Sequence, residues 1–349
     1  MQSMRQMTLA QMFGHEEEHV AEHVAEHGSE LEVFDLYCGA GGFSTGARDA
    51  GCRVVFACDS SEEAIETHRQ NHPQTNHWCT KLPRNDIPFP SDGRAFHVHG
   101  SPPCQQFSQM NQNGRSEAGL VSAKDQLEWY IDTAIASGAT SWSMENVSQS
   151  YVISIVKRKR LQHNRVFSYA VINFEKLGVP QSRIRLIAGS HELIAKLLRA
   201  TEEQPRRSIR SVIASPRGTH IRGSATGVEK RKKARALPGE AQYTYSRASW
   251  TDMCRTLDMP APTVVGRHAL TWITGDGEKC NRSVLYPREL AALQTFPVGY
   301  KFPQNKFFAY LQIGNALPPL VAQIMLTNRW SHEPDTPSRL WCPCVTLDD

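Results

Sequence analysis

The feature that most constrains the fold is a short apolar segment that ends in glycines, LEVFDLYCGAGG, at residues 31–42. It predicts a buried strand and a tight turn, because glycine lets the backbone approach a ligand closely before a helix begins. Asp59 follows Gly39 by 20 residues, at the end of the next apolar run. A carboxylate in that place accepts hydrogen bonds from ribose hydroxyls, which indicates a nucleoside-bearing cofactor. Ser44 replaces the third glycine of the dinucleotide fingerprint, which argues against a pyrophosphate ligand.

Further strand-and-loop units follow along the chain. The segments CRVVFACD, RAFHVHGSPPC, TSWSMENV and SRIRLIAGS are apolar runs that end in loops, and helix-length segments such as AKDQLEWYIDTAIASG separate them. This alternation predicts an α/β fold, with a Rossmann-like, mostly parallel sheet and helices on both faces. In such sheets ligands bind at the carboxyl ends of the strands.

Composition divides the chain into five parts. Residues 1–30 are a His- and Glu-rich extension, whose histidines recur every four residues and would line an exposed helical face. The alternation of strands and helices covers 31–199, and residues 200–300 are expected to form a smaller, irregular domain. A helix within 301–330 is expected to return to the first domain, and 331–349 form a tail. We predict no metal site in this chain.

The formal net charge of +4 hides a strongly basic segment. Between Pro205 and Arg235 there are ten basic residues against one acid, a balance of +9. Such a segment is typical of a contact with the phosphate backbone of a nucleic acid, and a solvated loop is the alternative. The chain has no apolar run of the roughly 20 residues that a membrane span needs. Its nine cysteines, without an export signal, indicate a reducing compartment.

Cys104, in GSPPCQQFS, is the candidate nucleophile. Two prolines stiffen the loop and fix the direction of the thiol, which becomes reactive if its neighbours lower its pKa. Glu145 follows a later strand, and Arg183 and Arg185 lie in the next unit. If these groups converge at consecutive strand ends they form an active site; a buried loop cysteine and ordinary salt bridges are the alternatives.

The ordered set FDLYCGAGGFS, GSPPCQQFS, MENV, QSRIR, RELAALQTFP and IGNALPP resembles the cytosine-C5 DNA methyltransferase family, in its unpermuted motif order. The resemblance covers about Leu31 to Arg329. It implies a class I methyltransferase fold in 31–199, a target-recognition domain in 200–300, and S-adenosylmethionine as the cofactor.

The resemblance also implies a cofactor site. Asp59 would hold the ribose, the segment at Asp86 would lie beside the adenine ring, and Asn315 would close the methionine end. The residues that it assigns to the cofactor are Phe34, Gly39, Ala40, Gly41, Gly42, Ser44, Asp59, Asp86, Ile87, Pro103, Asn315 and Ala316.

For catalysis, the resemblance implies that the Cys104 thiolate adds to C6 of a cytosine, so that C5 can attack the methyl group. Glu145, when protonated, would donate to N3 and accept from the exocyclic amine. Arg185, with Arg183, would hold O2. The target base must leave the duplex to reach the pocket.

The expected partner is double-stranded DNA. The residues expected to contact the substrate are Gln105, Ser108, Asn146, Gln181, Arg255 and Arg267. Thr263, His268 and Thr271 belong to the same recognition stretch by composition. We expect a monomer with no membrane association, cytoplasmic beside the nucleoid in a prokaryote or phage, and nuclear in a eukaryote.

Two alternatives stay open. One is the branch of the family that methylates cytosine in tRNA, although the Cys-Phe-Thr signature of that branch is absent here. The other is a catalytically idle relative that binds DNA, against which the presence of Cys104, Glu145 and Arg185 argues.

Overall fold

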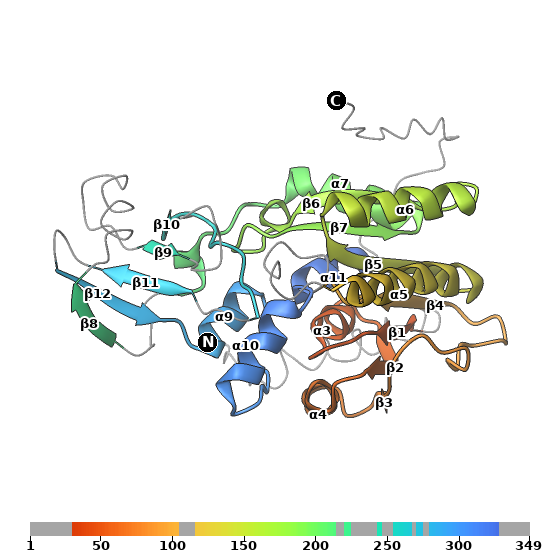
Figure 1. Cartoon of the computed structure of the whole chain (residues 1–349), viewed down its shortest axis with the longest axis horizontal. Helices are drawn as coiled ribbons and strands as arrows, with labels where there is room; N and C mark the ends of the chain where they lie inside the picture. The colour runs from red at the N-terminus through yellow and green to blue at the C-terminus, as the bar shows by residue number, and fades with distance from the viewer. Residues whose placement is uncertain are drawn as a thin grey trace, which may run out of the picture.

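The computed structural model describes residues 30–104, 116–213, 220–224, 243–245, 254–266, 270–274 and 279–327. These residues form two sheets, one of seven strands and one of five. Figure 1 shows the two sheets at opposite ends of the molecule, with helices α9 (Pro287–Leu293) and α10 (Lys306–Asn315) between them.

The seven-stranded sheet has the order β3-β2-β1-β4-β5-β7-β6. Strands β1 to β5 pair in parallel, whereas β7 runs antiparallel to both of its neighbours. The predicted α/β class with a mostly parallel sheet is therefore confirmed. The strands are β1 (Glu32–Leu36), β2 (Arg53–Asp59), β3 (Asn76–Cys79), β4 (Phe96–Gly100), β5 (Ser141–Val147), β6 (Ser168–Asn173) and β7 (Ile184–Gly189).

The edge strands β3 and β6 were not among the strands that the sequence predicts. Strand β3 has four residues, none of them buried, and β6 buries one of its six. A strand at the edge of a sheet lacks the continuous apolar run that marks a central parallel strand. Its sequence therefore gives little sign of its structure.

Alternating residues of the central strands pack against opposite layers of helices, because successive side chains of a strand point to opposite faces. In β1, Val33 packs with α3 (Gly42–Asp49), α7 (His191–Glu203) and α11 (Pro319–Leu326). Phe34 and Leu36 pack on the other face with α5 (Glu117–Ala136) and α6 (Ser150–Gln162). Helix α4 (Glu62–Asn71) packs Ile65 against β2. Both faces of the sheet are thus covered.

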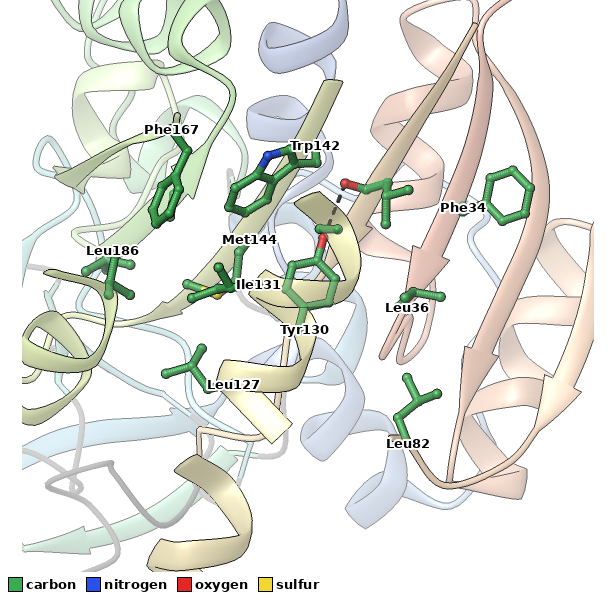
Figure 2. Packing of buried hydrophobic residues seen from close by; sticks show 14 of the residues in the cluster. Phe34, Leu36, Leu82, Leu127, Tyr130, Ile131, Trp142, Met144, Phe167 and Leu186 are labelled. Carbon is green, nitrogen blue, oxygen red and sulfur yellow. Dashed lines mark hydrogen bonds between the residues drawn. The ribbon is translucent and has the colours of Figure 1, made fainter. Parts of the chain in front are cut away.

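Tyr130 of α5 anchors the second of these layers (Figure 2). The ring is fully buried, and its hydroxyl donates to the carbonyl oxygens of Val98, at 3.2 Å, and Ser143, at 2.7 Å. Its phenol therefore ties α5 to both β4 and β5, next to the loop that follows β4. Gly100 makes this possible, since a Cβ there would lie 2.1 Å from the Tyr130 ring.

The second sheet is antiparallel, with the order β10-β9-β11-β12-β8. The expectation of an irregular domain between 200 and 300 is corrected on this point. Its strands have only three to six residues, too short for an alternating pattern to stand out in the sequence. They are β8 (His220–Ser224), β9 (Tyr243–Tyr245), β10 (Cys254–Thr256), β11 (Thr271–Thr274) and β12 (Lys279–Val284).

The predicted boundaries do not coincide with element boundaries. Helix α7 continues to Glu203, beyond the boundary at 199, and a core cluster joins Leu290 of α9 to Ile313 of α10 across the boundary at 300. The segment 301–330 contains two helices, α10 and α11, and not one. Pro318 and Pro319, at the N-cap and the first residue of α11, cannot continue a preceding helix. Residues 1–29 and 328–349 lie outside the described structure. In the part that is described, no helix is both long and apolar enough to span a bilayer.

Candidate active site

The turn between β1 and α3 has the backbone conformation that its glycines predict. Gly39 and Gly41 have φ of +53° and +89°, and Tyr37 has φ of +58°, which is uncommon for a residue with a side chain. At Gly42, a Cβ would lie 2.2 Å from the carbonyl oxygen of Leu317. The glycines therefore allow the turn to close against the segment between α10 and α11.

A cavity of about 580 Å³ opens beside this turn, at the carboxyl edge of the parallel strands. The ends of β1, β2, β4 and β5 and the junction of α10 and α11 form its wall. Nine predicted site residues line it: Gly39, Ala40, Gly42, Asp59, Pro103, Cys104, Glu145, Asn315 and Ala316. Its size and lining suit a nucleoside with an attached amino-acid chain.

Asp35, at the end of β1, supplies a buried carboxylate to the wall of the cavity. Its Oδ2 accepts a hydrogen bond from Ser44 Oγ at 2.7 Å, whereas its Oδ1 has no hydrogen-bond partner among the described residues. Burial raises the pKa of this carboxyl to about 7, against the opposing effect of the Ser44 hydrogen bond. An orphaned carboxylate oxygen beside a cavity fits a cationic ligand group.

Asp59 lines the same cavity from the end of β2. Its Oδ2 accepts from the backbone N–H of Gly39 at 3.0 Å, and its Oδ1 accepts from that of Ser61 at 2.9 Å. Burial raises the pKa of Asp59, and these backbone donors act in the opposite direction. The carboxylate therefore fixes the glycine turn and keeps its further lone pairs for a ligand.

Two predicted cofactor residues point elsewhere. The Asp86 side chain is exposed and forms an ion pair with Arg84, and Ile87 packs in the core on the α5 side of the sheet. The neighbouring residues Thr80, Lys81 and Leu82 line the cavity in their place. Of the remaining predicted cofactor residues, Phe34 is a core residue, Gly41 caps α3 and Ser44 binds Asp35.

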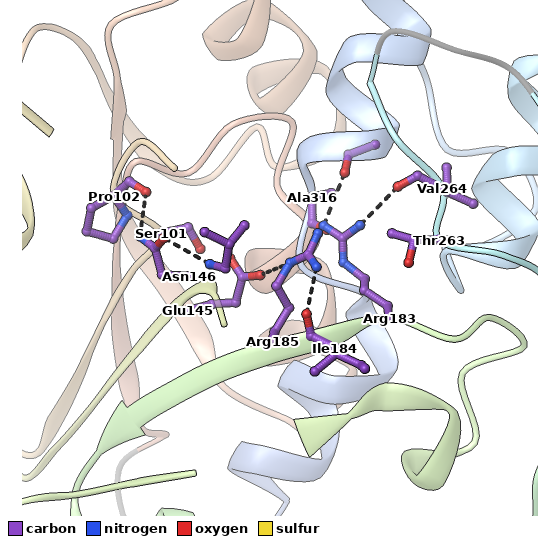
Figure 3. A network of polar contacts seen from close by, with 12 residues as sticks. Ser101, Pro102, Glu145, Asn146, Arg183, Ile184, Arg185, Thr263, Val264 and Ala316 are labelled. Carbon is purple, nitrogen blue, oxygen red and sulfur yellow. Dashed lines mark hydrogen bonds and ion pairs between the residues drawn. The ribbon is translucent and has the colours of Figure 1, made fainter. Parts of the chain in front are cut away.

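Cys104 lies in the loop after β4, half-buried, with its thiol on the cavity. Asn146 Nδ2 donates to the carbonyl oxygen of Pro102 at 3.1 Å, which holds the Pro-Pro segment against β5 (Figure 3). Burial and the nearby Glu145 raise the pKa of the Cys104 thiol, while Arg185 and Arg183 act to lower it. In the free protein the thiol is therefore protonated at neutral pH.

Glu145 of β5 and Arg185 of β7 form an ion pair at the cavity, with 2.9 Å between Oε1 and Nε. The contact does not have the geometry of a hydrogen bond, so Glu145 Oε1 has no donor among the described groups. Arg185 Nη1 donates to the carbonyl oxygen of Ile184 at 2.8 Å. Arg185 lies at the start of its strand and not after it. It reaches the carboxyl edge of the parallel strands only because β7 is antiparallel to β5.

Arg183 is fully buried and does not line the cavity. Its Nη1 donates to the carbonyl oxygen of Val264 at 3.0 Å, and its Nη2 donates to those of Gly314 and Ala316, both at 3.1 Å. Figure 3 shows the guanidinium of Arg183 turned from Arg185 towards Val264 and Ala316. A direct contact between Arg183 and a base does not fit this placement.

Gln181 has a similar place. Its amide nitrogen donates to Leu293 O at 3.0 Å and to Gln294 Oε1 at 2.7 Å, and its Oε1 accepts from Val264 N at 2.9 Å. It is fully buried, as is Asn146. Gln181 and Arg183 brace the segment at Val264, and Asn146 braces the Cys104 loop, so none of the three side chains is free to bind a substrate.

Four residues predicted to contact the substrate lie outside the described residues: Gln105, Ser108, Arg267 and His268. Most of the basic segment between 205 and 235 also lies outside them. Arg255 falls in β10 and Thr271 in β11. Thr263 Oγ1 donates to the carbonyl oxygen of Ser182 at 2.6 Å.

Sequence reasoning missed other residues of the wall. Asp35 carried a signal, since an acidic residue inside an apolar strand is costly unless it has a role. Tyr37 lines the cavity with a buried hydroxyl that has no partner among the described groups, and Ser101 and Gln312 also line it. Their positions depend on the turn and on helix α10, which local patterns do not indicate.

Comparison with known proteins agrees with this geometry. The family model for C-5 cytosine-specific DNA methylases matches residues 31–329. The chain is 25% identical to the type II methyltransferase M.HgiDI of Herpetosiphon aurantiacus, over 85% of this chain and 94% of that protein. It is 28% identical to M.AplI of Arthrospira platensis, over 84% of each.

A solved structure shares the fold. The Dnmt2 methyltransferase of S. pombe superposes with a TM-score of 0.58 at 15% identity, over 86% of this chain and 98% of that one. At this identity the likeness concerns the fold alone. The match to the family model, in contrast, covers most of the chain, and the chain belongs to the C-5 cytosine-specific DNA methylase family.

Proposed function

We propose that this DNA cytosine methyltransferase transfers the methyl group of S-adenosylmethionine to C5 of a cytosine flipped out of double-stranded DNA, through a covalent bond to Cys104. The observation that carries the proposal is one cavity that joins two sets of groups. Asp35 and Asp59 occupy the part beside the glycine turn. Cys104 and Glu145 occupy the part beside β4 and β5, with Arg185 at 2.9 Å from Glu145.

The first set fits the cofactor. The unpartnered Oδ1 of Asp35 suits the α-ammonium group of the methionine part, and Asp59 suits the ribose hydroxyls. Gly39, Ala40 and Gly42 let the backbone approach the ligand, while Pro103, Asn315 and Ala316 complete the wall. When bound, S-adenosylmethionine supplies an electrophilic methyl group. Thr80 to Leu82, and not Asp86, take the place beside the adenine.

The second set fits the base. Cys104 Sγ, as the thiolate, adds to C6 of the cytosine and makes C5 nucleophilic. Glu145, when protonated, donates to N3 and accepts from the exocyclic amine, using the carboxylate oxygen that lacks a donor in the structure. Arg185 holds Glu145 in place and stabilises the negative charge that develops at O2. The raised pKa of Cys104 means that its proton must leave when the base enters, a change that Arg185 and Arg183 favour.

Arg183, Gln181 and Asn146 act as positioning residues in this proposal. Arg183 and Gln181 link the segment just before β7 to the segment at Val264. Arg183 also binds Gly314 of α10, the helix that closes the cofactor cavity. Asn146 holds the loop that carries Cys104. Each acts by fixing a neighbour of the reacting groups.

We assign DNA contacts to the five-stranded sheet and to the basic segment between 205 and 235. Gln105, Ser108, Arg255 and Arg267 are the proposed contact residues on this side. In keeping with relatives named type II methyltransferases, we propose that the enzyme modifies DNA as part of a restriction–modification system, as a monomer in the cytoplasm.

Transfer of labelled methyl groups tests this function. Purified protein, labelled S-adenosylmethionine and either unmethylated duplex DNA or tRNA are incubated, and the position of the label in DNA is read by bisulfite sequencing. We expect label in duplex DNA, at C5 of cytosine within a fixed sequence. Label in tRNA would instead support the tRNA-methylating alternative, and DNA binding without label in either would support an idle relative.

A further inference from the structure

A continuous chain of hydrogen bonds runs along strands β4 and β5, on one face of the large sheet. His99 Nε2 lies 3.1 Å from Ser101 Oγ, and His99 Nδ1 lies 2.8 Å from Ser143 Oγ. His97 Nε2 lies 2.9 Å from the same Ser143 Oγ, and His97 Nδ1 lies 2.7 Å from Ser141 Oγ. We call these five residues the Ser–His chain. They share one face because they alternate along two strands in which His97 pairs with Ser141 and His99 with Ser143.

The two ends of the Ser–His chain differ in their surroundings. Ser101 lines the cavity that also holds Cys104 and Glu145. His99, Ser143 and His97 are fully buried, and Ser141 is half-buried at the start of β5, at the opposite edge of the sheet. The Ser–His chain therefore connects the active-site cavity, at the carboxyl edge of the parallel strands, with the opposite edge of the sheet. The three groups between the two ends are not reached by bulk water.

Both imidazoles are neutral at neutral pH. Burial lowers the pKa of His97 to about 3, and burial together with His97 lowers that of His99 well below its usual value. The ring of Phe43 stacks on His99, with 3.6 Å between the centroids and 4° between the planes, and shields it further. A neutral imidazole has one N–H donor and one acceptor nitrogen.

Two proton arrangements make the Ser–His chain continuous. Ser143 has one hydroxyl proton and two lone pairs, so it can donate to one ring while it accepts from the other. All four hydrogen bonds then point the same way, either from Ser101 towards Ser141 or the reverse. In the outward arrangement, Ser101 donates to His99 Nε2, and the lone pairs of its own oxygen are free on the cavity side. A chain with this property can pass a proton along its length without a charged group at rest in the core.

The proposed reaction requires a proton to leave the cavity. Among the described residues that line it, the carboxyl groups are Asp35, Asp59 and Glu145. The first two lie in the cofactor part, and Glu145 serves the N3 edge of the base. Ser101, by contrast, lies in the same short loop as Cys104, which attacks the carbon next to C5.

We propose that the Ser–His chain removes the C5 proton after methyl transfer, an inference that rests on the proposed function. The C5–H bond breaks, its electron pair forms the C5–C6 double bond, and the electron pair of the C6–S bond returns to Cys104 as the thiolate. Ser101 Oγ accepts the proton as it passes its own to His99 Nε2. His99, Ser143 and His97 pass on one proton each, and Ser141 releases one to water. The reverse flow, which reprotonates the Cys104 thiolate, restores the outward arrangement.

Two variants of Ser143 that match each other in shape test this proposal. Both add a methyl group on Cβ and suit a strand, but Ser143→Thr keeps the hydroxyl, whereas Ser143→Val replaces it by a second methyl group. His163→Gln is a control, since His163 pairs with Asp132 away from the Ser–His chain. Each protein is given a duplex with its recognition site, found by bisulfite sequencing, and the same duplex with 5-fluorocytosine at the target. The fluorinated base undergoes thiol addition and methyl transfer but has no C5 proton to lose.

We expect all variants to trap 5-fluorocytosine DNA at the rate of the unchanged protein. On ordinary cytosine, Ser143→Val should turn over at least about tenfold more slowly and accumulate the covalent adduct, as for loss of an acid–base group. Ser143→Thr and His163→Gln should turn over normally. Equal turnover of the Thr and Val variants would overturn the proposal, as would a Val variant that slows trapping and turnover alike, because the Ser–His chain would then be only structural.

A measurement on the unchanged protein covers the case in which Ser143→Val does not fold. In D₂O, turnover of cytosine should slow by more than the trapping of 5-fluorocytosine, because only turnover uses the chain. Equal isotope effects would contradict the proposal. Failure of the unchanged protein to trap 5-fluorocytosine on a site that it methylates would contradict the proposed function itself.

Discussion

Glu145 Oε1 lies 2.9 Å from Arg185 Nε across the antiparallel pair formed by β5 and β7. Arg185 is paired in register with Val147, so Glu145 contacts it diagonally, two residues along the strand. In a sheet parallel throughout, a side chain at the start of a strand would lie at the opposite edge from the carboxyl end of its neighbour. The reversal of β7 therefore brings a carboxyl and a guanidinium group together at the same edge of the sheet.

This pair gives the first prediction. Glu145→Gln preserves the shape of the side chain but removes its acid function and its ion pair with Arg185. We expect kcat for DNA methylation to fall by about 100-fold or more, as for loss of a general acid, with a smaller change in KM for DNA. Steady-state kinetics on duplex DNA measure both. Glu66→Gln, an exposed change on α4, serves as the control, and a kcat within twofold of normal for Glu145→Gln would rule out the acid role.

Cys104→Ser is expected to abolish turnover, because a serine hydroxyl at neutral pH is a far weaker nucleophile towards C6 than a thiolate. Binding of S-adenosylmethionine, measured by calorimetry, should persist, since Asp35 and Asp59 are unchanged. Cys79→Ser, at an exposed cysteine in β3, should leave methylation as it was. Near-normal methylation by Cys104→Ser would refute the covalent role.

The sequence predicted the large sheet and the residue types of the site because both depend on local patterns. The apolar runs of β1, β4 and β5 are buried almost throughout, and β2 buries four of its seven residues. The glycine turn has the positive φ angles that glycines permit. The roles of Cys104 and Glu145 came from motifs, and both residues line the cavity.

What the sequence did not predict depends on contacts between distant segments. Arg183 and Arg185 stand two residues apart and have the same residue type, yet Arg185 pairs with Glu145, which lines the cavity, while Arg183 donates to the carbonyl oxygens of Val264, Gly314 and Ala316. The antiparallel sheet was missed because its strands are short. Three of the four contacts of His97 and His99 in the Ser–His chain are with serines more than 40 residues away in sequence, so the chain is visible only in three dimensions.

Asp35 predicts a pH dependence of cofactor binding. Its pKa is about 7 in the free protein, above the 3.8 of an exposed aspartate. Below pH 7 the carboxyl is protonated and attracts an ammonium group weakly, so the affinity for S-adenosylmethionine should rise as the pH increases from 6 to 8. Binding near pH 7 should release a proton, which calorimetry in buffers of different ionisation enthalpy detects. Asp35→Asn should remove the release and the pH dependence, whereas Asp92→Asn, on the surface beside Arg94, should change neither.

The same shift affects the stability of the free protein. Because the folded carboxyl has the higher pKa, its contribution to stability is complete below about pH 3.8 and is lost as the pH rises through about 7. Asp35→Asn should therefore raise the Tm of the cofactor-free protein at pH 8 more than at pH 5. If Asp35→Asn changed the Tm by the same amount at pH 5 and at pH 8, Asp35 would have to be ionised at both pH values.

Arg183 gives the last prediction, which separates a positioning role from direct contact with the base. Arg183→Gln removes the guanidinium donor from the carbonyl oxygens of Val264 and Gly314, and it leaves that of Ala316 with the longer bond from Gln294 alone. Each unsatisfied group costs about 1–3 kcal/mol, so the free energy of unfolding in urea should fall by several kcal/mol. Arg158→Gln is the matched control, since Arg158 pairs with Glu128 at the surface and such a pair contributes about 0–1 kcal/mol. If Arg183→Gln kept its stability and lost only kcat, the guanidinium would have to reach the substrate, contrary to its place in the structure.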